Sequence, residues 1–179
     1  MRVDAPRTRE ARMPLHIKAK KYKVTSLQSG FLVAIIVLFI DQGSKLLVTA
    51  QAEILRDGMP IFPGLNFVFI QNAGVSFGLF GFAPPLVLII FGILICCILV
   101  IIIYKNNDLH HNISCGMIIG GALGNIIDRI RHGRVTDFID VYVGQFHWPS
   151  FNMADVTIVT GAIILSFGKI FFKRKEATR

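Results

Sequence analysis

Acidic side chains fall at or just beyond the ends of long apolar runs in this sequence. They are Asp41, Asp128, Asp137, Asp140 and Asp155, and Asn72, Asn125 and Asn152 accompany them. Because an ionisable side chain at membrane depth is costly, such residues usually face a cavity and take part in function. One aspartate alone would more simply end a helix at the membrane interface. Several aspartates together with amide side chains favour a functional site.

Two of these residues could form a catalytic pair. Asp137 and Asp155 are separated by eighteen positions, with Gly144 and Pro149 between them, so the chain can turn back and bring the carboxyl groups together. Two carboxylates about 3 Å apart cannot both ionise, and they share one proton. The ionised member can take a proton from water while the protonated member donates to a substrate carbonyl, which hydrolyses an amide without a covalent intermediate. The spacing makes contact feasible but does not require it. Asp140 is interpreted as structural.

Other polar residues recur at helical spacing. The groups that share a helical face are Asp41 with Lys45, Asn125 with Asp128 and Arg129, and Asn152 with Asp155. Asp41 and Lys45 stand four residues apart and can form an ion pair. Asn152 either supports the acidic site or caps the helix that follows it, and both roles stay open.

Other chemistries lack their residues. The sequence has no His-Glu-x-x-His zinc motif, no serine in a nucleophile turn and no glycine-rich phosphate loop. The three cysteines lie in apolar runs and are interpreted as small packing residues. The repeated small residues Gly116, Gly120, Gly121 and Gly124 predict a close contact between helices. We therefore predict no metal and no cofactor.

The composition indicates a small polytopic membrane protein. Of the 179 residues, 53% are hydrophobic and 17% are charged, whereas a soluble domain has about 25% charged residues. These values exclude a disordered chain, a coiled coil and a disulfide scaffold. The expected fold is an all-α protein with four transmembrane helices and a small extracytoplasmic β-sheet. The expected spans are 30–48, 86–104, 113–130 and 153–172, within one membrane domain at 30–172.

Basic residues gather in the two tails. Twelve of the nineteen Lys and Arg residues precede the first apolar run or follow the last one. This bias predicts that the tails, 1–29 and 173–179, are both cytoplasmic in a multi-pass membrane protein. Membrane lipids with anionic head groups, and no nucleic acid, are the expected partners of the tails. A cleaved signal peptide ending near Ala52 is the alternative for the first run, although Asp41 and Lys45 interrupt its pattern.

The two segments expected outside the membrane, 49–85 and 131–151, contain prolines and do not have helical patterns. Residues 65–70 and 134–143 are rich in β-branched and aromatic residues and predict a small sheet on the outer membrane surface. Phe67, Phe69 and Trp148 are expected to face lipid, with Trp148 in the interfacial aromatic belt rather than in contact with substrate.

Five sequence blocks together resemble the lipoprotein signal peptidase (signal peptidase II) family of integral-membrane aspartyl endopeptidases. The blocks are Asp41-Gln42-Gly43-Ser44-Lys45, Asn72-Ala73-Gly74-Val75-Ser76-Phe77, Gly120-Gly121-Ala122-Leu123-Gly124-Asn125-Ile126-Ile127-Asp128-Arg129, Gly133-Arg134-Val135-Thr136-Asp137-Phe138 and Phe151-Asn152-Met153-Ala154-Asp155. They follow the order and spacing of the family. Val75 departs from the small residue that the family has most often at its place.

The resemblance implies an enzyme of the bacterial cytoplasmic (inner) membrane that removes the signal peptide from diacylglyceryl-modified bacterial prolipoproteins, just before the lipidated cysteine, and that globomycin inhibits. It implies that Asp137 and Asp155 form the catalytic dyad. It further implies a polar shell that supports the dyad or binds substrate, formed by Asp41, Lys45, Asn72, Asn125, Asp128, Arg129 and Asn152.

Two functions compete with the peptidase. A small proton- or cation-coupled transporter would also carry acids in its spans, but along a path that crosses the membrane. In a structural or assembly subunit, the polar clusters would only bind neighbouring helices.

Overall fold

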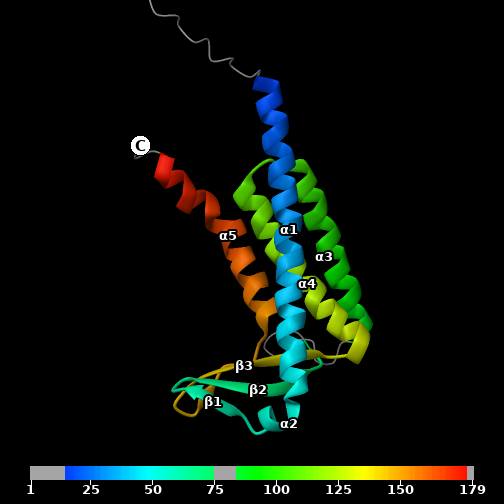
Figure 1. The fold of residues 1–179 in the computed structure, drawn as a ribbon, viewed down its shortest axis with the longest axis vertical. Helices are drawn as coiled ribbons and strands as arrows, with labels where there is room; N and C mark the ends of the chain where they lie inside the picture. Colours follow the sequence, from blue (N-terminus) through cyan, green and yellow to red (C-terminus); the bar gives the residue numbers. More distant parts are fainter. Residues whose placement is uncertain (1–14, 75–83, 177–179) are drawn as a thin grey trace, which may run out of the picture.

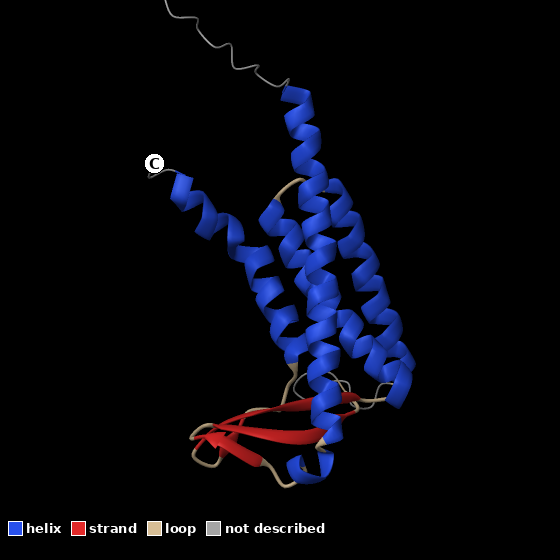
Figure 2. Cartoon of the chain, in the orientation of Figure 1, coloured by secondary structure: helices blue, strands red, loops and turns tan. Residues whose placement is uncertain are grey.

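The computed structural model describes residues 15–74 and 84–176, with side chains described over 26–74 and 84–168. In this part of the chain, long helices lie beside one another and a small sheet lies across one end of them (Figures 1 and 2). The helices are α1 (Leu15–Ala50), α2 (Ala52–Leu55), α3 (Pro85–Lys105), α4 (Leu109–His132) and α5 (Met153–Glu176). The strands are β1 (Met59–Phe62), β2 (Leu65–Asn72), β3 (Val135–Val143) and β4 (Phe146–His147).

The mostly helical fold with a small antiparallel sheet is confirmed. Within the described residues, 3 helices are long and apolar enough to cross a membrane, namely Ser26–Ala50, Pro85–Lys105 and Leu109–His132. The α3 helix alone, with 21 residues, is about 32 Å long, which matches the hydrocarbon core of a bilayer. The apolar part of α5, Met153–Gly168, is shorter, so the fourth span remains a prediction.

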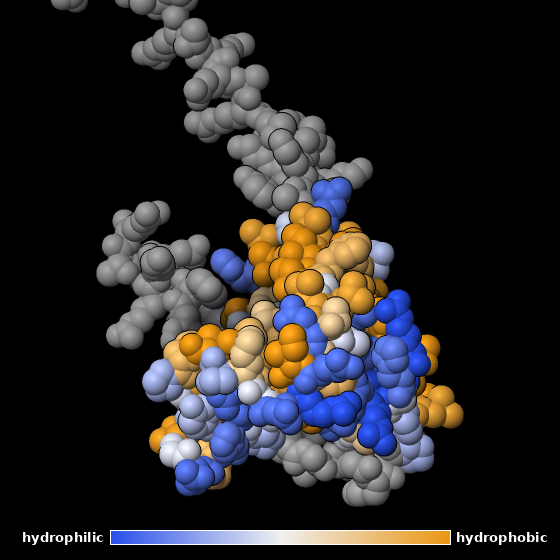
Figure 3. Space-filling model, turned by 60° about the horizontal axis from the view of Figure 1, so that its bottom comes forward, coloured by the Kyte–Doolittle hydropathy of each residue, from blue (hydrophilic) through white to orange (hydrophobic). Residues whose placement is uncertain are grey.

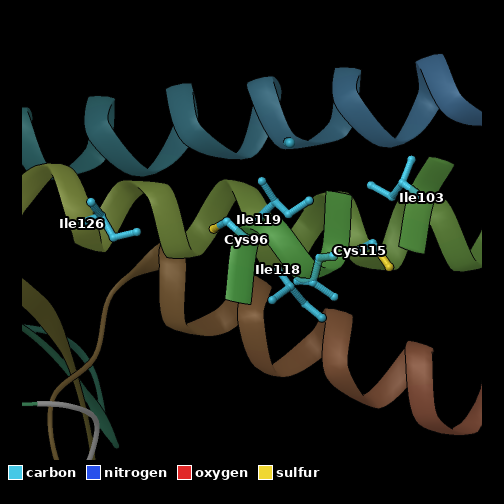
Figure 4. Packing of buried hydrophobic residues seen from close by; sticks show 8 residues of the cluster. Cys96, Ile103, Cys115, Ile118, Ile119 and Ile126 are labelled. Carbon is cyan, nitrogen blue, oxygen red and sulfur yellow. The ribbon is translucent and has the colours of Figure 1, made fainter. Parts of the chain in front are cut away.

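The helix bundle packs around α4. Buried apolar side chains of α4, among them Ile118, Ile119 and Cys115, meet α1, α3 and α5 (Figure 4). Apolar side chains on the outer faces stay exposed, such as Phe39 at 74% and Leu86 at 64%. A helix bundle whose outside is as apolar as its inside is built for lipid rather than for water.

Glycines let α1 and α4 approach closely. A Cβ atom added at Gly116 would overlap the carbonyl of Gly30, and one added at Gly120 would lie 2.5 Å from the carbonyl oxygen of Ala34. The predicted glycine face of this helix is therefore a contact between backbones. Cys96 and Cys115 are buried in the same core, whereas Cys97 is exposed.

The sheet has the strand order β1-β2-β3-β4, and all its pairs are antiparallel. Both predicted strands are present, with Asn72 opposite Val135 and Ile70 opposite Asp137 in the β2–β3 pair. Gly133 ends α4 in the left-handed conformation, with φ of 69°, and β3 begins two residues later. This turn connects the end of α4 that carries Asp128 and Arg129 directly to the strand that carries Asp137.

Two expectations for this region are wrong. Phe67 and Phe69 do not face lipid, because they pack against a buried cluster formed by Val48, Leu55 and Phe138. The segment after α1 is also not free of helix, since α2 forms a single turn that buries Leu55 in that cluster. Trp148, at 48% exposure, does lie on the surface.

Polar residues mark the sheet end of the molecule. Figure 3 shows hydrophilic side chains (blue) gathered on the face that carries the sheet, while hydrophobic side chains (orange) cover the helices above it. Such a boundary is what a protein presents where the bilayer gives way to water.

Candidate active site

The structure brings Asp137 and Asp155 into one site. Asp137 lies on β3 and is only 2% exposed, and Asp155 lies in the first turn of α5. Both side chains line the same groove. The sequence predicted that the chain could turn back to join them, and the β3–β4 hairpin is the turn that does so.

Asn152 contacts both carboxyl groups. Its side-chain Nδ2 donates to Asp137 Oδ1 at 2.7 Å, and its backbone N–H donates to Asp155 Oδ2 at 3.3 Å. Its Oδ1 accepts from the backbone N–H of Asp155 at 3.1 Å, which is the hydrogen bond of an N-terminal cap. The two roles left open for Asn152 therefore occur together.

Each carboxyl group has a second amide partner. Asn72, at the end of β2, donates from Nδ2 to Asp137 Oδ2 at 2.8 Å. Asn125, from α4, donates from Nδ2 to Asp155 Oδ1 at 3.1 Å. Amides from three different elements thus fix the directions of the two carboxyl groups, as the geometry of a reaction requires.

A buried charge network lies behind these amides. Lys45 Nζ is 2.9 Å from Asp41 Oδ2, 3.0 Å from Asp128 Oδ2 and 2.9 Å from Asn125 Oδ1. The predicted pairing of Asp41 with Lys45 is confirmed, and Asp128 of α4 joins it. Asp41 also accepts from the backbone N–H of Ala154 at 2.9 Å, so the network joins α1 and α4 to the start of α5.

Arg129 lies at the rim of the site. Its guanidinium donates to the carbonyl oxygens of Gly74 at 2.7 Å and Asn125 at 3.2 Å. Its Nε is buried without a hydrogen-bond partner among the described residues. Arg129 therefore fixes the turn that follows β2 and adds a positive charge beside the paired carboxyl groups.

The sequence analysis missed Gln42. Its Nε2 donates to Asp128 Oδ1 at 3.1 Å, to the carbonyl oxygen of Gly124 at 3.2 Å and to Asp41 Oδ2 at 3.2 Å. Neighbouring residues of a helix point in different directions, so its place beside Asp41 gave no sign of this contact. Its position inside the first of the five sequence blocks was the only signal.

An apolar groove leads to the paired acids. It encloses about 490 Å³ between α3, α4 and α5, within the range of small-ligand sites. Most of its lining is apolar, and its polar members gather where the two aspartates lie. The apolar lining includes Val87, Phe91, Ile95, Ala122, Ile126, Ile158 and Val159.

Burial changes the acidity of Asp137. Removal from water, with a smaller contribution from the negative charge of Asp155, raises the pKa of its carboxyl group to about 6. Hydrogen bonds from Asn72 and Asn152 and the charge of Lys45 act in the opposite direction. A carboxyl group that keeps its proton to this pH suits a pair in which one member is an acid and the other a base.

Two further observations complete the site. Among the residues whose side chains are described, no group of three His, Cys, Asp or Glu side chains could hold a metal ion. Asp140 lies outside the network around Asp137 and Asp155 and contacts Asn66 and His147 instead.

A helix bundle with the apolar surface of a membrane protein, and two carboxyl groups at the end of a groove, fit the class of membrane aspartic peptidases. The family model described as signal peptidase (SPase) II matches residues 33–171. The chain belongs to the signal peptidase II family, as the sequence blocks indicated.

Individual relatives agree. The lipoprotein signal peptidase of Wigglesworthia glossinidia brevipalpis is 39% identical over 144 residues, which cover 79% of this chain and 94% of the relative. That of Shigella boydii serotype 4 (strain Sb227) is 40% identical over 136 residues, covering 73% and 82%. A bacterial membrane enzyme solved by the in meso method at 2.3 Å resolution superposes with a TM-score of 0.72 at 28% identity, covering 83% of this chain and 91% of that one. Nothing in these comparisons supports the transporter alternative.

Proposed function

We propose that this peptidase cleaves prolipoproteins that carry diacylglycerol on the cysteine after the cleavage site, with Asp137 and Asp155 as its catalytic residues. The observation that supports the proposal is that the buried carboxyl group of Asp137 and the half-buried one of Asp155 line one end of the same apolar groove, with Asn152 hydrogen-bonded to both.

The groove accounts for a lipid-bearing substrate. A diacylglyceryl group confines the substrate to the bilayer, and an apolar groove between α3, α4 and α5 can take up acyl chain or apolar signal peptide. The peptide bond before the modified cysteine then lies beside the carboxyl groups, where water reaches it from the sheet end of the molecule.

The proposed reaction needs one proton on the pair. The ionised carboxylate takes a proton from water, and the water oxygen attacks the carbonyl carbon of the scissile bond while the protonated carboxyl group donates to the carbonyl oxygen. The tetrahedral intermediate collapses when the C–N bond breaks: the departing cysteine nitrogen receives a proton from the pair, and a hydroxyl group of the intermediate returns its proton to the pair. The products are the carboxylic acid of the signal peptide, which ionises in water, and the free amino group of the lipidated cysteine, and the pair again holds one proton.

The polar shell has two proposed roles. Asn72, Asn125 and Asn152 touch the carboxyl groups and orient them. The network of Asp41, Lys45 and Asp128, together with Arg129, fixes the helices and the turn that carry those amides, and Arg129 also faces the groove.

The proposed topology has both tails in the cytoplasm, residues 153–172 as a fourth span and the sheet at the outer face. The basic tails support this orientation. Alternation in the outer part of the β3–β4 hairpin, residues 141–148, supports it as well, since one side there carries the exposed apolar residues Val141, Val143, Phe146 and Trp148. Such a side suits the outer interface of the bilayer.

The test is cleavage of a diacylglyceryl-modified prolipoprotein by the purified protein in detergent. We expect product from the wild-type protein, and none from Asp137→Asn or Asp155→Asn, because an amide can neither take the proton from water nor supply one. Equal cleavage by either variant would remove that residue from the dyad. A folded wild-type protein that cleaves only the unmodified precursor would contradict the substrate assignment.

Globomycin gives an independent measurement. We expect it to block cleavage by the wild-type protein and to compete with the lipid-modified substrate, since both would occupy the groove beside the dyad. Uncompetitive or absent inhibition would argue against a shared site.

A further inference from the structure

A second buried carboxyl group lies on β3 and takes no part in the proposed reaction. Asp140, three residues after Asp137, is 6% exposed. Its Oδ2 accepts from Asn66 Nδ2 at 2.9 Å, and its Oδ1 is 2.9 Å from His147 Nδ1. A buried carboxylate needs such partners, and these come from the strands on either side, β2 and β4.

His147 is fixed from two directions. An ionised carboxylate only accepts hydrogen bonds, so the proton of this contact is on His147 Nδ1. The imidazole ring also stacks on Tyr142, with ring centroids 5.0 Å apart and planes 15° apart. His147 is nevertheless 51% exposed, so this position does not fill the core.

The contact joins the two sides of the hairpin that leads back to the site. The β4 strand has only two residues, Phe146 and His147, and the chain then runs through exposed Trp148 and Pro149. Backbone hydrogen bonds tie this return segment to β3 at Trp148 and at Phe151. The bond between Asp140 and His147 is a side-chain link along the same path.

The return segment ends at Asn152, the residue that contacts both members of the dyad. Phe151 pairs with Ile139 on β3, and Asn152 follows at once, donating to Asp137 and Asp155. A shift of residues 146–151 along β3 would therefore move Asn152 and change how the two carboxyl groups face each other.

We propose that His147 is a positioning residue for the hydrolysis: its hydrogen bond to Asp140 fixes the return segment 146–151, and through it Asn152 and the two catalytic carboxyl groups. This inference rests on the proposed function. His147 does not line the apolar groove, so its loss affects the rate of the chemical step and leaves substrate binding nearly unchanged.

Two substitutions separate the hydrogen bond from the ring. His147→Phe keeps an aromatic ring over Tyr142 but has no donor for Asp140. His147→Asn loses the ring but keeps an N–H donor close to the position of Nδ1. Gln145→Ala, at an exposed position in the turn of the same hairpin, is the matched control.

The measurement is kcat and KM for the diacylglyceryl-modified prolipoprotein with full-length protein in detergent, together with a thermal melting curve for each variant. We expect His147→Phe to lower kcat about tenfold with KM within about twofold of wild type, since misplacement by about 1 Å can cost up to a hundredfold. We expect His147→Asn to stay within about threefold of the wild-type kcat, and Gln145→Ala to match wild type.

Several results would overturn the inference. The first is a wild-type kcat in His147→Phe, and the second is an equal loss of kcat in His147→Phe and His147→Asn. The third is a change in KM without a change in kcat. The fourth is a His147→Phe protein that no longer folds, which would make the role of His147 structural. If folded wild-type protein fails to cleave, the proposed function fails together with this inference. If wild type cleaves, Asp137→Asn does not and His147→Phe behaves as wild type, this inference alone fails.

Discussion

The carboxyl group of Asp137 is buried at a cost in free energy. Its raised pKa, about 6, means that the folded protein disfavours the ionised form relative to the unfolded chain. Between about pH 4 and pH 6 the folded state binds more protons than the unfolded state, so the free energy of unfolding falls as pH rises through this window. At pH 7 the penalty is at most about 3 kcal/mol.

We therefore expect Asp137→Asn to abolish cleavage and yet to raise the melting temperature at pH 7. The gain should shrink toward pH 4, where Asp137 is protonated in the folded state and already about half protonated in the unfolded chain. Thermal unfolding in detergent at the two pH values checks this, with Asp57→Asn, at an exposed residue, as the control. A melting temperature at pH 7 no higher than wild type would show that burial of Asp137 carries no penalty.

Lys45 illustrates the opposite case, a buried charge that is fully paired. In Lys45→Met, Asp41 and Asp128 would remain buried without their common counter-charge. Removing one partner of a buried ion pair costs about 3–5 kcal/mol, so we expect a lower melting temperature and loss of activity. The loss is measured by comparing the melting temperature of Lys45→Met with that of the control Lys105→Met, at an exposed lysine at the end of α3. Adding Asp128→Asn to Lys45→Met should restore part of the lost melting temperature. Equal melting of the two single variants would contradict this account of the network.

At this scale the sequence predicted contacts within one element better than contacts between elements. Asp41 and Lys45 share a helical face, and their spacing predicted the pair. No spacing could show that Asn72 meets Asp137 or that Asn125 meets Asp155, because each contact joins two elements. The resemblance to a family supplied these residues, and Gln42 and the link between Asp140 and His147 were not found.

Among the elements, α4 determines the arrangement of the others. It contacts α1, α3 and α5, and its Gly116, Gly120 and Gly121 face backbone carbonyl groups of α1 and α5. It also carries Asn125, Asp128 and Arg129 on the turns nearest the sheet. The distance between α1 and α4 therefore sets the distance between Lys45 and its two partners on α4.

Gly116→Ala should separate these helices. Its Cβ would overlap the backbone carbonyl of Gly30, which cannot move aside as a side chain can, and we expect a loss of about 1–3 kcal/mol. Gly43→Ala is the matched control, because a Cβ there meets nothing within 4 Å and should stabilise the helix by up to about 1 kcal/mol. Melting temperatures in detergent measure both changes. If the two variants melt alike, the close approach of α1 to α4 is not needed for stability.

The sequence also predicted the elements themselves unevenly. The lengths of the apolar runs predicted α3 and α4 to within a few residues of their ends, and the runs of β-branched residues predicted the positions of β2 and β3. The edge strands were not predicted, because β1 contains Pro60 and β4 has only two residues. Phe67 and Phe69 were predicted to face lipid because a hydrophobic strand pattern does not show which face of the sheet is covered by other elements. In the structure, α2 and the end of α1 cover the face that carries these two side chains.

For the whole molecule, the proposal that remains to be tested is orientation. Basic tails, an amphipathic hairpin and a polar sheet end all agree with cytoplasmic termini and an outer active site. Composition and charge predicted the class of protein at this scale. The apolar part of α5, Met153–Gly168, is shorter than the other three apolar helices, so an experiment must test whether α5 crosses the membrane.

Fusions can establish the topology. We expect green fluorescent protein joined after Arg179 to fluoresce in cells, because it folds in the cytoplasm, and alkaline phosphatase at the same place to be inactive. Alkaline phosphatase inserted in the hairpin turn at Gln145 should be active, since it requires export. Active phosphatase at the C-terminus would mean that α5 does not cross the membrane in the proposed direction.

The ion pair of Asp41 with Lys45 has a consequence for biosynthesis. The α1 helix leaves the ribosome before α4 has been made, so it meets the lipid while Asp128 and Asn125 do not yet exist. Because Asp41 and Lys45 stand on one face of the same helix, they neutralise each other during this interval, and the segment enters the membrane with no net charge. The same two residues that later stabilise the finished site thus make the first helix acceptable to the insertion machinery before its partners arrive.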